Sequence, residues 1–155
     1  MSLVSVKQVY SLVLHIPIVH RIGRLVGSRA VGVGAAALFA LVPIGVNYSH
    51  LGNADHHAAV SLIGAWLLFL CCRLVDPSLP VAGLRRLAVA LVCVRAALLL
   101  TWHGSLLYLG LAEATLLLAA AFGGRRELMR VQSWSALATA VLLLPVLLLS
   151  PPPLG

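Results

Sequence analysis

Two charged side chains lie deep inside long apolar runs of the sequence, where they could move a proton or an ion, or hold two helices together. Arg95 lies within the run 87–102, and Glu113 lies within the run 105–122. Each is nine residues from Gly104, in the short polar turn between the runs. In an antiparallel hairpin of helices, both charges would lie at the same depth, roughly 13 Å from the turn. The spacing therefore predicts that the two opposite charges form an ion pair.

This pair has a structural and a functional interpretation. A proton or ion relay normally needs further titratable groups, and the other apolar runs contain none at mid-depth. We therefore expect Arg95 and Glu113 to act as a structural intramembrane pair that fixes the register of the hairpin. A small ion or proton transporter that uses the two side chains is an alternative, and so is contact of the pair with a partner subunit.

Histidines gather in the stretch NYSHLGNADHHAAV, and histidine is a common ligand of zinc and other divalent ions. His50, His56 and His57 are the candidates for such a site. Their spacing matches no recognised metal-binding motif, so we expect no metal. The sequence also has no GxSxG, no HExxH and no glycine-rich phosphate loop followed by Lys and Ser or Thr. We expect no catalysis by this chain alone.

The composition predicts the elements that must position these residues. The chain has 155 residues, of which 61% are hydrophobic and 10% charged, and its mean hydropathy is +1.05. Ordinary soluble domains carry about 25% charged residues, whereas long uncharged runs are typical of membrane-spanning helices. We therefore expect an all-α fold, a polytopic transmembrane helical bundle within residues 30–150. Its spans, about five in number, are predicted at 30–47, 58–75, 87–102, 105–122 and 133–150.

The basic residues are distributed unevenly along this map. They precede the first span or lie around the second and fourth connections between spans, and the other connections contain none. Because loops rich in Lys and Arg stay on the cytoplasmic or matrix side, the N-terminus is predicted on that side and the C-terminus on the outer side. The residues concerned are Lys7, Arg21, Arg24, Arg29, Arg73, Arg85, Arg86, Arg125, Arg126 and Arg130.

The first 29 residues contain no acidic side chain and have helical spacing of apolar residues. This pattern favours an amphipathic basic arm, 1–29, that lies in the membrane interface and ends or kinks near Pro17. Such a start resembles a mitochondrial targeting segment. We expect the mitochondrial inner membrane, with a bacterial plasma membrane as the alternative. The tail 151–155 is rich in proline and cannot continue a helix.

Small residues form a predicted packing surface, because they recur every three or four positions and allow another helix to approach closely. On one continuous helix this stripe would serve internal packing or a partner helix. By contrast, span 133–150 is almost uniformly Leu and Val, so it is expected to face lipid or apolar partners and to contribute no polar site. The stripe consists of Gly23, Gly27, Ala30, Gly34 and Ala37.

The string His20-Arg21, then Ser28-Arg29 entering a first span, then a second span ending at Asp76, resembles the membrane-anchor subunits of succinate dehydrogenase. The resemblance implies a quinone site that includes Arg29 and Asp76, and a haem b ligand in the second span, for which His57 is the candidate. The sequence departs from the family's pattern where Pro77 follows Asp76, and His57 is 19 residues from Asp76.

Together these features predict a non-catalytic integral membrane subunit of a multi-subunit complex, in the mitochondrial respiratory chain. Its partners would be other membrane subunits and lipids, including bound phospholipid attracted by the net charge of +7. Nucleic acid is not expected, because its recognition needs aromatic side chains interleaved with basic ones on a polar face. A quinone- or haem-binding anchor and a small transporter are the alternative functions; otherwise we expect no cofactor.

Overall fold

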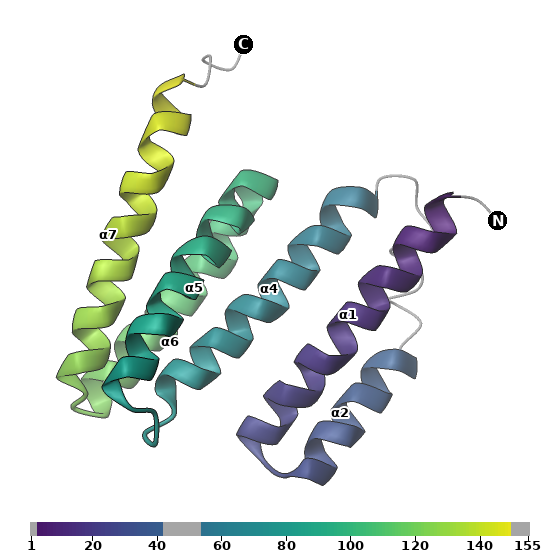
Figure 1. Ribbon diagram of the computed structural model, residues 1–155, viewed down its shortest axis with the longest axis horizontal. Coiled ribbons are helices and arrows are strands. Elements are labelled where there is room, and N and C mark those ends of the chain that lie inside the picture. The colour runs from purple at the N-terminus through teal and green to yellow at the C-terminus, as the bar shows by residue number, and fades with distance from the viewer. Residues whose placement is uncertain (1–2, 42–53, 150–155) are drawn as a thin grey trace.

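The computed structural model describes residues 3–41 and 54–149, with only the backbone given for 3–12, 54–58, 103 and 147. Regular structure in this part of the chain is entirely helical, so the all-α prediction is confirmed. The far end of predicted span 30–47, His50 and the tail 151–155 lie outside the described residues. The helices are α1 (Leu3–Val26), α2 (Arg29–Leu41), α4 (Ala54–Val75), α5 (Val81–Thr101), the short 3-10 helix η1 (His103–Ser105), α6 (Leu106–Phe122) and α7 (Arg126–Leu149) (Figure 1).

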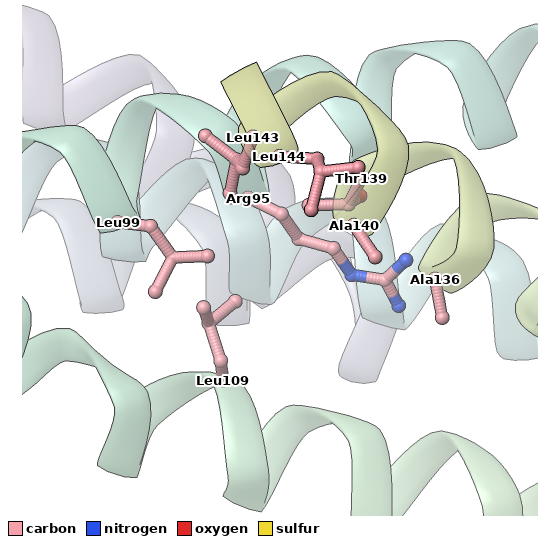
Figure 2. A pocket seen from close by; sticks show the side chains of 8 residues that line it. All are labelled: Arg95, Leu99, Leu109, Ala136, Thr139, Ala140, Leu143 and Leu144. Atoms are coloured by element: carbon pink, nitrogen blue, oxygen red, sulfur yellow. The ribbon is translucent and has the colours of Figure 1, made fainter. Parts of the chain in front are cut away.

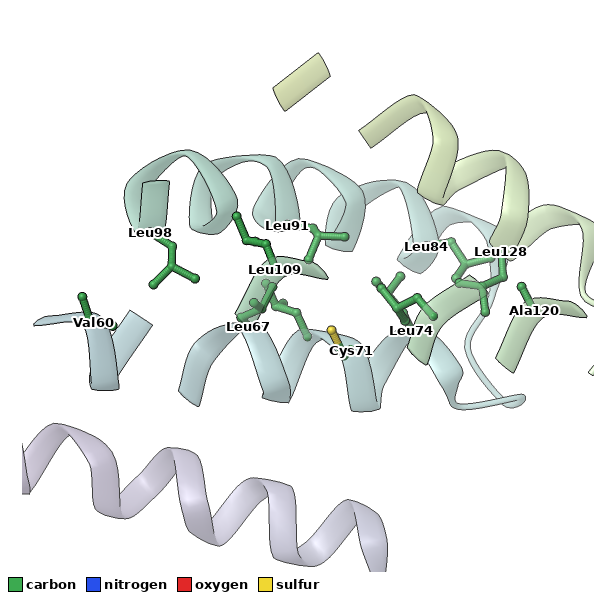
Figure 3. Packing of buried hydrophobic residues seen from close by; sticks show 12 residues of the cluster. Val60, Leu67, Cys71, Leu74, Leu84, Leu91, Leu98, Leu109, Ala120 and Leu128 are labelled. Carbon is green, nitrogen blue, oxygen red and sulfur yellow. The ribbon is translucent and has the colours of Figure 1, made fainter. Parts of the chain in front are cut away.

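Helices α4, α5, α6 and α7 form a four-helix bundle. Both α4 and α7 pack against α5 and against α6, so that α5 and α6 lie across the bundle from each other. The core-facing side chains recur every seven residues, because two turns of about 3.6 residues return to the same face of a helix. They include Val60, Leu67 and Leu74 on α4, Leu84, Leu91 and Leu98 on α5, and Leu109 and Leu116 on α6 (Figure 3).

Helix α7 turns polar side chains toward this core. Gln132, Ser135 and Thr139 are buried, whereas Trp134 and Leu137 on the outward face are 66% and 55% exposed. The expectation that this segment contributes no polar site is therefore wrong. Its few polar residues recur every three or four positions, so they fall on one face of the helix although leucine and valine dominate the composition.

The N-terminal segment forms a helix that packs against its neighbours. Helix α1 runs for 24 residues through Pro17 and packs along α2 and α4 (Figure 1). The expected end near Pro17 is wrong, because the helix ends only at Val26. The chain then reverses at Gly27 and Ser28, where the Ser28 hydroxyl accepts a hydrogen bond from the N–H of Val31 at the start of α2.

This reversal divides the predicted stripe of small residues. Gly23 on α1 lies against Gly32 on α2, and a Cβ on Gly23 would lie 2.8 Å from the Gly32 Cα atom. A continuous stripe was expected because the spacing of small residues continues across the turn. The part on α2, which comprises Ala30, Gly34 and Ala37, is exposed in the structure.

The connections between helices lie at two opposite ends of the molecule. Figure 1 shows the connections after α1, α4 and α6 at one end, and the α5–α6 connection with the last turn of α7 at the other. The sequence map put the two termini on opposite sides. Because α1 and α2 are antiparallel, Leu3 instead lies at the same end as Leu149 (Figure 1).

Within the described residues, one helical stretch is long and apolar enough by length and composition to cross a membrane, over Arg126–Val146. Arg29–Leu41, Ala59–Val75 and Leu106–Phe122 are apolar but shorter. Large apolar side chains nevertheless cover much of the outer surface on several helices, among them Val33, Leu38, Leu68, Val89, Leu107, Leu111, Phe122, Leu142 and Leu149.

Candidate functional site: a buried polar cluster

The ion pair expected from the spacing about Gly104 is formed. The Arg95 Nη2 atom on α5 pairs with the Glu113 Oε1 atom on α6, and the Arg95 side chain is only 3% exposed. The Ser105 hydroxyl holds the turn by sharing its one hydrogen between the carbonyls of Leu98, at 3.0 Å, and Trp102, at 2.5 Å. Since α5 and α6 are not packed directly together, the pair links them across the bundle.

Helix α7 supplies two further partners. Arg95 Nη1 donates to the Ser135 hydroxyl at 2.8 Å, and the Gln132 amide donates to Glu113 Oε2. The Ser135 hydroxyl in turn donates to the Gln132 carbonyl at 2.9 Å. Thr139 continues the same face, and its hydroxyl donates to the Ser135 carbonyl at 2.8 Å. The four side chains of Arg95, Glu113, Gln132 and Ser135, here named the buried polar cluster, thus connect α5, α6 and α7.

Three side-chain atoms of the buried polar cluster have no hydrogen-bond partner among the described residues. These are Arg95 Nε, Arg95 Nη2 and Gln132 Oε1, all fully buried, and of them Nη2 lies in the ion pair with Glu113. A buried polar atom without a partner costs about 1–3 kcal/mol. The cluster is therefore held together by strong contacts, but it leaves Arg95 Nε and Gln132 Oε1 buried without a partner among the described residues.

A pocket of about 400 Å³ adjoins the cluster between α5, α6 and α7. Arg95 and Thr139 are its only polar lining residues, and the guanidinium lies beside Ala136 and Ala140 (Figure 2). The remaining walls are leucines: Leu99, Leu109, Leu143 and Leu144. The pocket is therefore almost entirely apolar and suits an apolar occupant.

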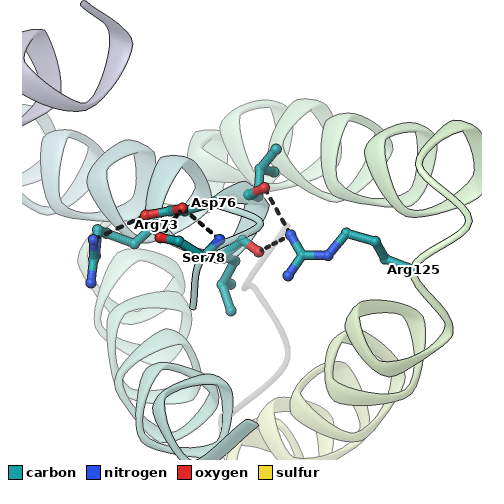
Figure 4. A network of polar contacts seen from close by, with 6 residues as sticks. Arg73, Asp76, Ser78 and Arg125 are labelled. Carbon is teal, nitrogen blue, oxygen red and sulfur yellow. Dashed lines mark hydrogen bonds and ion pairs between the residues drawn. The ribbon is translucent and has the colours of Figure 1, made fainter. Parts of the chain in front are cut away.

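A second polar network lies at the end of the bundle where the arginines gather (Figure 4). Arg125 donates to the last carbonyls of α4, Leu74 at 3.1 Å and Val75 at 2.7 Å, and so caps that helix. Asp76 accepts hydrogen bonds from the Ser78 hydroxyl at 2.6 Å and the Ser78 N–H at 2.9 Å. These bonds, with smaller contributions from Arg73 and Arg125, hold the pKa of Asp76 below its ordinary value.

The residues expected to bind quinone or haem are not brought together. Arg29 is exposed at the start of α2, and Asp76 is engaged by Arg73 and Ser78 after α4. His57 lies in the first turn of α4, at the opposite end of that helix from Asp76 and about 28 Å away along its axis. Arg29 and Asp76 form no ion pair with each other in the part of the chain that the structure describes. The quinone site and the haem ligand, which were expected as separate features, stay predictions.

The metal candidates receive no support from the part of the chain that carries side chains in the structure. No three His, Cys, Asp or Glu side chains there come close enough to hold a metal ion. His56 and His57 begin α4, and His50 falls outside the described residues.

Sequence reasoning missed the contribution of α7 to the cluster. Gln132 and Ser135 are the partners of Glu113 and Arg95, and their spacing on one helical face was the available signal. Models of protein families, curated proteins and solved structures offer no match to this chain that could assign a role to these residues.

Proposed function

We propose that this chain is an integral membrane protein, a bundle of spanning helices that serves as a non-catalytic subunit of a larger membrane complex. The observation that carries the proposal is the polarity of α7, whose buried face is partly polar and whose exposed face is apolar. The most buried positions of α7 include Gln132 and Ser135, while its outward positions include Trp134 and Leu137. Soluble monomers rarely expose continuous apolar patches of more than a few hundred Å², whereas lipid tails favour such a surface.

The lengths of the helices agree with this proposal. Helices α1, α4, α5 and α7 have 24, 22, 21 and 24 residues. At a rise of about 1.5 Å per residue they measure roughly 32–36 Å, enough for a hydrocarbon core of about 30 Å. Helix α6 has 17 residues, or roughly 26 Å, and would need local thinning of the bilayer.

The positions of the arginines support one orientation of the bundle in the membrane. Arg24, Arg29 and Arg73 lie beside turns at one end of the bundle, and so do the arginines that begin α5 and α7 (Figure 1). By the positive-inside rule this end faces the cytoplasm or the matrix. Both Leu3 and Leu149 would then lie on the outer side.

A structural role for the buried polar cluster supports the non-catalytic part of the proposal. Arg95 and Glu113 join two helices that do not pack directly, and Gln132 and Ser135 tie a third helix to them. Both Nη atoms of Arg95 and both carboxylate oxygens of Glu113 thus face a partner on another helix. A cluster of this kind fixes the register of the bundle.

An exposed face of α2 supports the proposal that the chain is a subunit of a larger complex. Helix α2 packs on α1, and its exposed small residues Ala30, Gly34 and Ala37 leave room for close approach of another helix. A Cβ at Gly34 would meet no atom within 4 Å. The setting that we propose is the respiratory chain of the mitochondrial inner membrane, with a bacterial plasma membrane as the alternative.

The test is a native gel of the protein extracted in mild detergent, with mass spectrometry of the co-migrating chains. A large band that contains respiratory subunits supports the whole proposal, and a large band without them supports a subunit of another complex. Gly34→Leu, which fills the exposed face of α2, should release the chain from the band, whereas Val33→Leu should not. A band that holds only this chain would contradict the subunit role.

A further inference from the structure

The first turns of α5 and α7 bring arginines together at one end of the bundle. Both helices begin at this end and run in the same direction (Figure 1). The hydrogen bond from Arg95 Nη1 to Ser135 fixes the level of one helix against the other. Arg86 and Arg126 each lie nine residues before that contact, and therefore at one level, roughly 13 Å below it. Nine residues make about two and a half turns, so both positions fall on the helix face opposite the buried polar cluster.

Neighbouring acidic side chains do not neutralise these arginines. Arg85, Arg86 and Arg126 are exposed, and no acidic side chain among the described residues pairs with them. Glu127, the acidic residue in the first turn of α7, pairs with Arg130 at 3.0 Å. The four arginines, here named the α5–α7 arginine surface, thus carry an excess of positive charge. Because the guanidinium group binds phosphate oxygens through two parallel hydrogen bonds, this surface is complementary to a phosphate group.

Apolar side chains continue from these arginines along the same two helices. Val89 on α5 follows Arg86 by three residues and is exposed. On α7, Met129, Trp134 and Leu137 are exposed as well. A soluble phosphate compound would leave these apolar side chains uncovered, whereas a phospholipid would cover both parts of the surface.

We propose that the α5–α7 arginine surface binds an anionic phospholipid, with its phosphate on the guanidinium groups and its acyl chains along Val89, Trp134 and Leu137. The headgroup needs a net negative charge, because the ammonium group of a zwitterionic headgroup would be repelled by the same arginines. Attraction of anionic lipids to basic residues near the membrane surface is a general source of affinity. This inference rests on the proposed membrane location, and it assigns a particular surface to the phospholipid that the net charge predicts.

The experiment measures the melting temperature of the purified full chain in a non-ionic detergent as phosphatidylglycerol is added to the micelles. Phosphatidylcholine with the same acyl chains is the matched probe. A ligand that binds only the folded protein raises the melting temperature in proportion to the occupancy of its site. We expect a saturable rise with phosphatidylglycerol and at least about tenfold weaker apparent binding of phosphatidylcholine, because each arginine near an anionic headgroup contributes about fivefold in affinity.

Variants locate the site. Arg85→Gln combined with Arg86→Gln should weaken the apparent binding of phosphatidylglycerol by at least about tenfold. Arg85→Lys with Arg86→Lys keeps the charge and should weaken binding less. Arg21→Gln with Arg24→Gln removes the same charge from the exposed side of α1 and should change the binding at most about twofold. The melting temperature of each variant without added lipid shows whether it is folded.

Equal stabilisation by the two lipids, no saturable rise, or equal losses in the two glutamine variants would overturn the proposal. Glycerol phosphate that raises the melting temperature as much as phosphatidylglycerol would assign the surface to a soluble phosphate compound and overturn the lipid class. Unaltered lipid binding in the Arg85 and Arg86 glutamine variant, with release of the chain from the large native band, would assign the surface to an acidic partner subunit instead. Extraction of cell membranes with alkaline carbonate tests the membrane location independently of any lipid site.

Discussion

At the scale of single residues, the Arg95–Glu113 pair is the most consequential contact in the molecule. Removing one partner of a buried ion pair is far more costly than removing both, because the remaining charge loses its compensation. Arg95 is 3% exposed and Glu113 30% exposed, so the uncompensated cost is larger when Arg95 is the charge left behind.

Glu113→Gln should therefore lower the free energy of unfolding by on the order of 3 kcal/mol, and with it the amount of protein in the membrane. Thermal unfolding in detergent and immunoblots of membranes measure the two effects. Glu127→Gln is the control, because Glu127 and Arg130 form an exposed pair that should contribute at most about 1 kcal/mol. Equal losses in the two variants would contradict a structural role for Glu113.

The double variant Arg95→Met with Glu113→Leu should recover most of the stability that Glu113→Gln loses, because apolar pairs of similar volume replace buried ion pairs without penalty. Recovery of both stability and assembled levels is the expected result. Recovery of stability with a lost transport activity would instead favour the relay.

A second prediction at the residue scale concerns the pH dependence of stability through Asp76. Its pKa is held low in the folded protein, first by the Ser78 hydroxyl and then by the Ser78 N–H. A carboxyl group with a lowered folded-state pKa contributes stability above its unfolded-state pKa and loses it as pH falls through the folded value. Ser78→Ala should raise the pKa of Asp76, so that the variant loses this contribution at a higher pH than the unaltered protein.

The measurement is the melting temperature of both proteins in detergent as pH is lowered. The difference between them should be present above the ordinary pKa of Asp and should shrink in acid, where Asp76 is protonated in both. A difference that stays constant with pH would mean that Ser78 acts through the loop and not through Asp76.

At the scale of secondary-structure elements, the face that α7 turns inward decides how the bundle closes. Ser135 accepts from Arg95, while Ser133, two residues away, is exposed and donates to a carbonyl of its own helix. Ser135→Ala should cost about 1–3 kcal/mol because Arg95 Nη1 loses its acceptor. Ser133→Ala should be close to neutral. Chemical or thermal unfolding of the two variants in micelles measures the free energy of unfolding that each one loses. Equal losses would show that the Ser135 hydroxyl does not stabilise the buried polar cluster.

Two glycines of α2 test the contact between α1 and α2, because Gly32 lies in that contact and Gly34 lies outside it. A Cβ at Gly32 would lie 2.7 Å from the His20 carbonyl oxygen, whereas one at Gly34 would meet nothing within 4 Å. Gly32→Ala should therefore force the two helices apart and lower the melting temperature. Gly34→Ala should be neutral or stabilise α2 by up to about 1 kcal/mol, because alanine favours helix. Tolerance of Gly32→Ala would show that α1 and α2 are not packed as described.

The sequence predicted some of these elements well, for reasons that can be named. Long apolar runs marked α4 to α7, and the equal distances of Arg95 and Glu113 from Gly104 indicated their pairing. The reversal at Gly27 and Ser28 could not be recognised, because helical spacing of small residues continues through it. The polar face of α7 was overlooked since three polar residues carry little weight in a segment averaged for composition.

At the scale of the whole molecule, the polarity of the surface and the orientation of the helices bear on the membrane location together. One cluster of polar groups lies between α5, α6 and α7, large apolar side chains are exposed on several helices, and the arginines other than Arg95 lie toward one end. The start of α1 at Leu3 and the end of α7 at Leu149 share the other end (Figure 1). A membrane would thus leave both termini on the side away from the arginines.

The most direct measurement is protease access to an epitope tag at each terminus of the full chain in sealed membrane vesicles of known orientation. The account predicts that both tags are cut from the outer side, and that a cleavage site inserted after Ser78, at the arginine-rich end, is cut only after the vesicles are opened. Tags that are cut from opposite sides would contradict the arrangement of α1 beside α2 and α4.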